Sequence, residues 1–513
     1  MARWDHGYVT DLAYTTNAFQ EATPAWLTAC SILLGYRPPD LATSFRYADL
    51  GCGNGLNALI AAATNPHSDV WGFDFNPTHI ENARRMAAQA GLANAHFEET
   101  SFEELAGRPV ETFDIVIAHG VLSWISLENR RHLTTAIGRL LRPGSLAYLS
   151  YNTTPGWSGV EPIRLLMRQL AEHGHQRTDQ SAASIFQVID QLRTGGATFF
   201  RSHPGLKARL DEMRVQHPRY IAHEFLNRDW HPVMFADVAE AMADTKTSYI
   251  GSATVMENVD AISVQEAILP VLHATLDPAT RETIRDLASA KSFRRDLWRK
   301  GGEPLPDRER LAMLDAMTLV WTGKPLEAEI TFPGPIGVVT GQEEVYRPML
   351  SAIRDAPTTI GRLRALPALQ GRQVGEFLQS TILMMGGGFV HPAWPQHREV
   401  RNRASTARLN AAIVERLRLG LDVPRIAAPL IGSSIAIDMM EGLVIAQLLD
   451  HGPDEIETLV DGVLNDVILT GRSMMRDGQQ LTNPAEVRAL VGDMVRGVLA
   501  RRLSLWRGLG VID

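Results

Sequence analysis

Length, composition and charge restrict the kinds of protein this chain can be. At 513 residues it is too long for one typical hydrophobic core, so two to four domains are expected. A formal net charge of −8 and an isoelectric point of about 6.1 lack the basic excess typical of nucleic-acid binders. The two cysteines, Cys30 and Cys52, exclude a disulfide framework and a cysteine metal site. With no signal pattern and no apolar run long enough for a membrane span, the sequence predicts a reduced, cytoplasmic protein without nucleic-acid, membrane or metal partners.

Residues 46–151 alternate between strand-like and helix-like patterns. Short apolar runs bounded by turn residues predict five strands, at Arg46–Leu50, Asp69–Asp74, Ala95–Glu99, Phe113–Ala118 and Leu146–Tyr151. Amphipathic stretches predict three helices between them, at Leu56–Ala63, Thr78–Ala90 and Leu127–Leu140. This alternation predicts an α/β fold with a doubly wound, mostly parallel Rossmann-like sheet and helices on both faces.

The turn after the first predicted strand carries the most specific signal. Asp49 ends an apolar run, and Gly51, Gly53 and a third glycine at 55 follow before a helix opens. Alternate glycines let the backbone turn at positive φ and approach a ligand, and the helix N-terminus offers free N–H groups. The acid suits the cationic amine of an amino-acid-bearing nucleotide such as S-adenosylmethionine. The alternatives are a dinucleotide loop, which needs glycine where Leu56 stands, and a ligand-free turn.

Polar and aromatic residues follow the other predicted strands, at the edge where ligands bind in open α/β sheets. Asp74 ends the second strand, where a carboxylate can accept hydrogen bonds from ribose hydroxyls. Ser101 and Phe102 follow the third and suit an adenine, although Phe102 as plain core is an alternative. The fourth and fifth strands lead into His119, Tyr151 and Asn152.

The pattern changes after residue 151. A helical insertion or cap is expected over residues 158–218. Phe235–Ala243 and Thr247–Thr254 then predict a helix and a strand that completes the sheet, whereas residues 259–300 read as helical. The arginine-rich stretches Arg294–Lys300 and Arg398–Arg408 are interpreted as solvated helix faces.

These patterns predict a division of the chain into units. Residues 1–45 are expected to form an N-terminal lid with helices, and residues 46–258 the cofactor-binding domain. Residues 301–395 predict a winged-helix-like module in which three glycines at 386–388 form a turn. Residues 396–513 predict a helical C-terminal domain.

A second polar cluster comprises Glu224, Asn227, Asp229 and His231. The run from residue 223 begins like a zinc-protease helix, but the second histidine of that motif is replaced by Asn227. A structural hydrogen-bond network is favoured for this cluster, with a substrate-facing role as the alternative.

Taken together, the motifs resemble class I S-adenosylmethionine-dependent methyltransferases. The resemblance is carried by D-L-G-C-G-N-G from Asp49, G-F-D-F-N-P from Gly72, T-S-F from Thr100, H-G-V-L-S-W-I from His119 and S-Y-N-T-T-P-G-W from Ser150. More narrowly, the chain resembles the bacterial subfamily with a methyltransferase regulatory domain, here over residues 217–300, and its layout is similar to bacterial lysine methyltransferases that modify outer-membrane proteins. The residue runs A-H-E-F-L-N and F-R-R-D and the opening G-Y-V-T-D-L-A-Y-T carry this narrower match.

The resemblance implies a set of cofactor-binding residues. Asp49, Gly51 and Gly53 are expected at the methionine end of S-adenosylmethionine, Asp74 at the ribose, and Ser101 and Phe102 at the adenine. Tyr8 and Tyr14 would lie over the cofactor as part of the lid, and His119 close to the reacting centre.

Candidate acceptor-site residues follow from the chemistry of the donor. The sulfonium methyl is electrophilic, so the protein need only align an attacking group and exclude water. A lysine amine must first become neutral, since its ordinary pKa is about 10.4. His119 is expected to accept the proton, with Tyr151 and Asn152 orienting the amine; the alternatives are a packed His119 and a core Tyr151.

Three functions remain open at this point. The first is a protein lysine methyltransferase, because about 250 residues beyond the sheet offer a surface for a polypeptide. The second is a small-molecule O- or N-methyltransferase of a biosynthetic pathway. The third is a non-enzymatic sensor of S-adenosylmethionine that binds DNA, which the acidic balance disfavours. The oligomeric state, including a homodimer, stays open.

Overall fold

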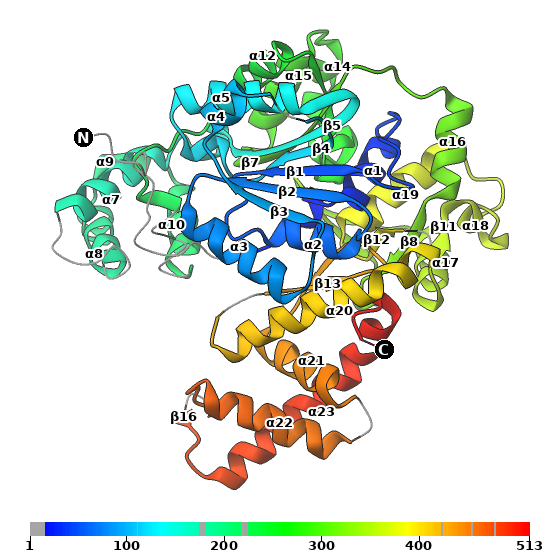
Figure 1. Cartoon of the computed structure of the whole chain (residues 1–513). Coiled ribbons are helices and arrows are strands. Elements are labelled where there is room, and N and C mark those ends of the chain that lie inside the picture. The colour runs from blue at the N-terminus through cyan, green and yellow to red at the C-terminus, as the bar shows by residue number, and fades with distance from the viewer. Residues whose placement is uncertain are drawn as a thin grey trace.

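The computed structural model describes residues 16–512, except 110, 174–180, 217–220, 222–223, 395, 422–423, 453–454 and 477–478. At its centre lies a seven-stranded sheet of order β3-β2-β1-β4-β5-β7-β6 (Figure 1). Its strands are β1 Arg46–Leu50, β2 Asp69–Asp74, β3 Ala95–Glu99, β4 Phe113–Ala118, β5 Leu141–Asn152, β6 Thr247–Ser252 and β7 Phe293–Lys300. All neighbouring pairs from β3 to β5 are parallel, whereas β7 runs antiparallel to β5 and β6. The predicted Rossmann-like class is confirmed.

Helices cover both faces of the sheet. On one face lie α1 Pro24–Leu33, α2 Leu56–Thr64 and α3 Pro77–Gln89, and on the other α4 Phe102–Gly107, α5 Leu127–Leu140, α12 Phe235–Ala243 and α15 Pro278–Ala288 (Figure 1). Strand residues alternate between the two cores because successive side chains point to opposite faces. Tyr47 and Ile117 enter the first core, and Ala48 and Ala118 the second.

The helix ends follow local chemistry that is visible in the sequence. Pro77 occupies the first turn of α3, and the Asn76 side chain accepts a hydrogen bond from Thr78 N at 3.0 Å. Gly91 ends this helix at φ +59°, with Leu92 N donating to Ala87 O at 3.0 Å. Ser126 caps α5 through Asn129 N at 3.2 Å.

Strand β7 corrects the helical prediction for residues 259–300. The helices α13 Asp260–Ser263, α14 Leu269–Ala274 and α15 agree with that prediction, but Phe293–Lys300 is a strand inserted between β5 and β6. Arg294–Lys300 is therefore not a solvated helix face. Arg294 and Asp296 lie two residues apart, so they share one face of the strand, where their side chains pair in the buried interior.

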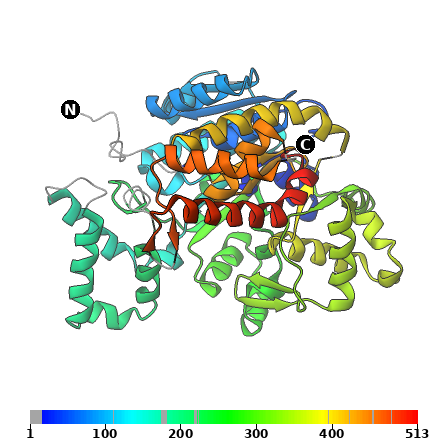
Figure 2. The same cartoon turned by 90° about the horizontal axis from the view of Figure 1, so that it is seen from below.

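The predicted insertion is present as a helical cap. It comprises α7 Glu161–His173, α8 Ser181–Thr194, α9 Thr198–Ser202 and α10 Leu206–Arg214. A separate apolar core joins these helices to Trp157, Phe225 and Trp230, which flank the insertion in the sequence. Figure 2 shows the cap projecting to one side of the sheet domain.

The region after β7 begins with α16 Asp307–Ala316. A three-stranded antiparallel sheet of order β11-β8-β12 follows, formed by β8 Thr318–Trp321, β11 Thr358–Thr359 and β12 Val390–Ala393. It is accompanied by the hairpin β9 Thr331–Gly334 and β10 Gly337–Thr340 and by α17 Glu343–Asp355, α18 Ile360–Arg364 and α19 Val374–Gly386. The turn expected at 386–388 is present, with Phe389 N donating to Met384 O at 3.0 Å. The winged-helix description of this region stays a prediction.

The C-terminal region begins with α20 Gln396–Arg418, which packs on α2 and α3 (Figures 1 and 2). Side chains of this helix bind carbonyl groups at the ends of those two helices: Ser405 Oγ donates to Ala63 O at 2.6 Å and Arg408 Nε to Ala90 O at 2.9 Å. The interpretation of Arg398–Arg408 as a solvated face is thus wrong for Ser405 and its buried neighbours Asn402 and Thr406. This helix joins the C-terminal region to the sheet domain.

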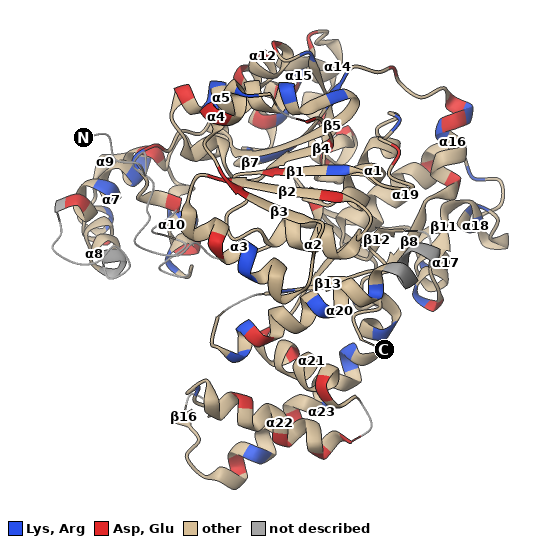
Figure 3. Ribbon diagram, in the orientation of Figure 1, with Lys and Arg blue, Asp and Glu red and all other residues tan. Residues whose placement is uncertain are grey.

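Further elements complete this region. The helices α21 Met439–His451, α22 Ile456–Leu469 and α23 Pro484–Leu509 follow α20, together with the hairpins β13 Arg425–Ala428 with β14 Ser433–Ala436 and β15 Met475–Arg476 with β16 Gln479–Gln480. Lys and Arg side chains are interspersed with Asp and Glu along the described elements (Figure 3). Among the described residues, no helix is both long enough and apolar enough to cross a bilayer.

Candidate active site

The glycine loop joins β1 to α2. It lies where the strand order reverses, because β1 has β2 as its other neighbour and the adjacent strand β4 has β5. Gly51 has φ +73°, and a Cβ atom there would lie 2.6 Å from Val121 Cγ2, so only glycine fits. Gly53 has φ +55°, but a Cβ there would meet none of the described residues within 4 Å. The loop is therefore closed on the side of β4 and open beside Gly53, where a ligand can approach the backbone.

Two carboxylates border this opening. Asp74 is engaged by the loop, since its Oδ2 accepts from Gly53 N at 2.8 Å and its Oδ1 from Asn76 N at 2.9 Å. Asp49 is only 2% exposed, and none of the described residues donates a hydrogen bond to its carboxylate. Burial, assisted by the negative charge of Asp74, raises the pKa of Asp49 to about 8. Such a group gains most from a cationic ligand that restores its charge.

Ser101 and Phe102 stand at the start of α4. The Ser101 hydroxyl is used in a capping box, because its Oγ accepts from Glu104 N at 3.1 Å while Ser101 N donates to Glu104 Oε2 at 2.8 Å. The Phe102 ring is half-buried and lies beside Gly51. The structure thus brings the aromatic wall to the glycine loop. The adenine contacts of both residues stay predictions.

His119 follows β4 and lies in a stack of aromatic rings. Its ring is parallel to Phe19 at 3.6 Å between centroids, and its Nδ1 lies 2.9 Å from Tyr148 Oη. Burial and the positive charge of Arg295 lower the pKa of His119 to about 3. The imidazole is therefore neutral at physiological pH and is a poor proton acceptor, which argues against the predicted role as base.

Tyr151 lies on the opposite face of the sheet from His119. Positions alternate along β5, so Tyr148 and Asn152 share one face and Tyr151 points to the other core. Its hydroxyl donates to Asp296 Oδ2, and burial raises the pKa of this phenol far above its usual range. The alternative of a core tyrosine, rather than an acceptor-orienting one, is the arrangement that the structure shows.

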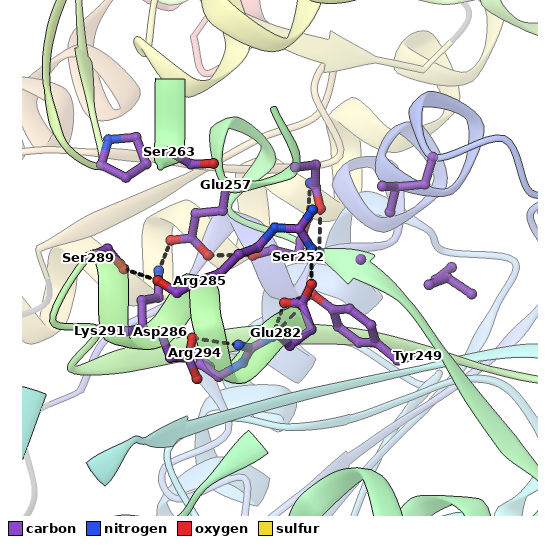
Figure 4. Close-up of a pocket in the computed structure, with 15 residues that line it drawn as sticks. Tyr249, Ser252, Glu257, Ser263, Glu282, Arg285, Asp286, Ser289, Lys291 and Arg294 are labelled. Carbon is purple, nitrogen blue, oxygen red and sulfur yellow. Dashed lines mark hydrogen bonds and ion pairs between the residues drawn. The ribbon is translucent and has the colours of Figure 1, made fainter. Parts of the chain in front are cut away.

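Asp296 connects Tyr151 to a buried ionic network around Arg294. Arg294 is its centre, donating to Asp296 at 3.0 Å, to Asp286 at 2.6 Å and to Glu282 at 2.9 Å. Arg294, Asp286 and Glu282 help to line a cavity of about 180 Å³ between β6 and α15 (Figure 4). Each carboxylate is held by the same guanidinium, so the network ties β7 to α15.

Asn152 shares the face of Tyr148 and closes β5. Its backbone is fixed, with its N donating to Ser123 Oγ at 2.8 Å and its O accepting from Val233 N at 3.0 Å. Its Nδ2 donates to Glu224 Oε1 at 3.2 Å. The second polar cluster of the sequence is thus split. Glu224 contacts the end of β5, whereas Asp229 pairs with His231, with 3.7 Å between Oδ1 and Nε2.

The N-terminal segment approaches the glycine loop. Tyr8 and Tyr14, predicted to cover the cofactor, lie outside the described residues. Directly after them, Thr16 Oγ1 accepts from Asn54 Nδ2 at 3.2 Å, and Phe19 N donates to Asn57 Oδ1 at 2.9 Å. Phe19 is a site residue that sequence reasoning missed, because a lone aromatic before a helix gives no signal of the histidine on which it stacks.

These residues fit S-adenosylmethionine in charge and in hydrogen-bonding capacity. An ammonium group would supply Asp49 with the counter-charge that no described residue provides, and the open side of Gly53 admits a ligand beside Asp74. Asp74 still has acceptor capacity toward hydroxyl groups, since each of its oxygens can accept more than one hydrogen bond. The fold and this site define a class I S-adenosylmethionine-dependent methyltransferase.

Comparisons with known proteins agree with this assignment to the methyltransferases. Residues 43–222 match a family model described as a methyltransferase domain, and residues 217–300 one described as a predicted methyltransferase regulatory domain. An uncharacterized protein of Synechocystis is 30% identical over 99% of both chains. The chain therefore belongs to the S-adenosylmethionine-dependent methyltransferases with a methyltransferase regulatory domain.

Two further comparisons define the extent of the likeness. PKMT2 from Rickettsia typhi, solved in complex with AdoHcy, has the same fold with a TM-score of 0.72, at 19% identity, over 96% of this chain and 99% of that one. Trans-aconitate 2-methyltransferase from Streptomyces coelicolor is 31% identical, over 31% of this chain and half of that one. The likeness to PKMT2 thus extends through the regions beyond the sheet, whereas the other is confined to part of the chain.

Proposed function

We propose that this protein transfers the methyl group of S-adenosylmethionine to lysine amines of a protein substrate. The observation that carries the proposal is the extent of the match to PKMT2, which includes the cap, the middle region and the C-terminal helices as well as the sheet. These regions surround the sheet domain with surface that a small acceptor does not need. The layout that the sequence shares with bacterial lysine methyltransferases points the same way.

The chain's own residues have three tasks in this reaction. Asp49 and the glycine loop hold the donor, whose sulfonium supplies an electrophilic methyl. His119 and Phe19 form a flat, uncharged wall near the end of β4, which excludes water from the transfer. Asn152 stands at the end of β5 on the same face as this wall and can orient an incoming amine.

Mass spectrometry of proteins incubated with the enzyme and isotope-labelled S-adenosylmethionine tests the proposal. Unfolded bacterial envelope proteins are the first acceptors to try, and methylated lysines are expected in their peptides. Asp49→Asn serves as the control that should lose the label. Label that appears only in small metabolites, or only on residues other than lysine, would contradict the proposal.

A small-molecule methyltransferase is the second candidate. It is favoured by the match to trans-aconitate 2-methyltransferase, which covers about a third of this chain. The same incubation with a metabolite extract in place of proteins decides between the two, since only one acceptor pool should take up label at a useful rate.

A further inference from the structure

Glu224 is a buried acid that no role described so far explains. It is 5% exposed, yet the hydrogen bond between its Oε1 and Asn152 Nδ2, at 3.2 Å, is its one hydrogen bond with the described residues. A buried carboxylate normally requires a cation or several donors to offset its desolvation. Burial accordingly raises the pKa of Glu224 to about 7, although Asn152 and the more distant Arg209 oppose the rise.

The acid lies at the edge of the sheet where the methyl transfer takes place. Asn152 is the last residue of β5, and its backbone N is bound by Ser123 Oγ from the loop after β4. The same loop is tied to β5 a second time, through Gly120 N and Ser150 Oγ at 2.8 Å. Glu224 therefore contacts the end of β5, to which the loop that begins with His119 is hydrogen-bonded.

The cap helices hold Glu224 in this place. Arg164 of α7 donates from Nε to Phe225 O at 3.0 Å and from its terminal nitrogen to Asn227 O, which fixes the backbone directly after the acid. The Phe225 ring packs against Trp157, with 5.9 Å between centroids. The backbone that follows the acid is thus fixed by α7 and by the packing of Phe225, which holds the buried carboxylate against the end of β5.

We propose that Glu224 and Asn152 form the subsite that binds the acceptor amine, with Glu224 taking its proton. This inference rests on the proposed function, and it names the group that recognises the substrate. A buried, ionised carboxylate attracts an ammonium group strongly, and the Asn152 amide fixes the carboxylate in position.

The proton balance of the step is complete with these groups. The ammonium gives one proton to the Glu224 carboxylate and becomes a neutral amine. The nitrogen lone pair then forms the new N–C bond as the C–S bond of the donor breaks, and the electron pair of that bond goes to sulfur. The product leaves as a secondary ammonium, and Glu224 returns its proton to solvent. His119 is unsuited to this task because of its low pKa, and Tyr151 because it lies on the other face of the sheet.

The Glu224→Gln variant tests the assignment, because glutamine preserves shape and the contact with Asn152 while removing the charge. With a lysine peptide mapped on the wild type, kcat/KM is expected to fall by roughly 100-fold. Titration calorimetry is expected to show unchanged S-adenosylhomocysteine binding but weaker peptide binding to the S-adenosylhomocysteine complex. Glu224→Asp should recover part of the activity, since it restores the carboxylate.

The pH profile separates this role from a structural one. In the wild type, kcat/KM should rise as pH passes about 7, because only the ionised carboxylate binds and deprotonates the amine. That rise should disappear in Glu224→Gln. Among the described charged groups, Arg209 of α10 acts on the acid directly, and Arg164 of α7 binds the backbone of the residues that follow it. Asp229 and His231 lie farther along the same segment and pair with each other, so Asp229→Asn is the matched control and should keep the rise.

The outcomes are distinct. If the wild type methylates protein lysines while Glu224→Gln retains the wild-type pH profile and peptide affinity, the inference is overturned and the proposed function stands. If the wild type methylates no lysine in any protein, the proposed function is wrong and the inference falls with it.

Discussion

Two groups of buried acids in the sheet domain are in opposite situations. Asp296, Asp286 and Glu282 surround Arg294, and each accepts a hydrogen bond from that one guanidinium. Glu224, on the side of Asn152, and Asp49, at the glycine loop, have one hydrogen bond and none, respectively, from the described residues. The first group is paired within the fold through Arg294 and serves stability, although Asp286 Oδ2 has no hydrogen-bond partner among the described residues. The second group is kept short of donors, and a cationic ligand can complete it.

The largest expected effect comes from breaking the paired group. Arg294→Met leaves three carboxylates buried without their shared cation, so the free energy of unfolding should fall by about 3–5 kcal/mol. Denaturant titration at neutral pH measures the change. Arg285→Met is the control, since Arg285 pairs with Glu282 and Asp260 nearer the surface and should cost far less. Equal losses in the two variants would contradict the central place given to Arg294.

The next effect concerns Asp49 and its dependence on pH. Because its pKa is raised to about 8, the carboxyl is mainly protonated in the free protein at pH 6–7, and ligand binding must release that proton. The affinity for S-adenosylhomocysteine should therefore increase as pH rises toward 8, by up to about tenfold per pH unit. Calorimetry in buffers of different ionisation enthalpy detects the released proton.

A variant shows whether Asp49 is the source of that dependence. In Asp49→Asn the affinity should be weaker and the pH slope between 6 and 8 should flatten. Asp69→Asn is the matched control and should keep the slope. Asp69 begins β2, at the end of that strand away from Asp74, and forms a half-exposed ion pair with Arg46. A slope that survives in Asp49→Asn would assign the proton to another group.

The smallest expected effect concerns Tyr151, which lies on the face of β5 opposite to Asn152. Tyr151→Phe removes one donor from Asp296, which retains Arg294, so the loss of stability should be about 1 kcal/mol. Methyl-transfer rates should stay within about twofold of the wild type, since no step is assigned to this hydroxyl. A large loss of kcat with unchanged stability would instead support the predicted role of Tyr151 in orienting the acceptor amine.

Much of the fold was accessible from the sequence, and the exceptions have a physical cause. Strands β1 to β4 were predicted with correct bounds. Turn residues bound all four, and the buried strand β4 is also a short, mostly apolar run. Strand β7 was missed because five of its eight residues are charged, and Arg294 and Asp296 satisfy one another only in the assembled sheet. Charge in a sequence window does not show whether it is paired in three dimensions.

The residues of the candidate site also divide into those that could be found from the sequence and those that could not. The glycine loop, Asp49 and Asp74 could be found because their chemistry is local to strand ends. Alternation along β5 also held the information that Tyr151 faces away from His119 and Asn152. Glu224 was visible as part of a polar cluster, but its contact with Asn152 joins residues 72 positions apart, which no local pattern encodes.

The contacts of α20 have a consequence for how the protein can be divided. Carbonyl groups at the ends of α2 and α3 receive hydrogen bonds from Ser405 and Arg408, which are encoded more than 300 residues later. A truncated chain that stops after the sheet would leave these acceptors bare and expose the apolar flank of α2. The donor-binding domain thus relies on α20 to cover one flank of α2, and these hydrogen bonds cannot form until translation has passed Arg408.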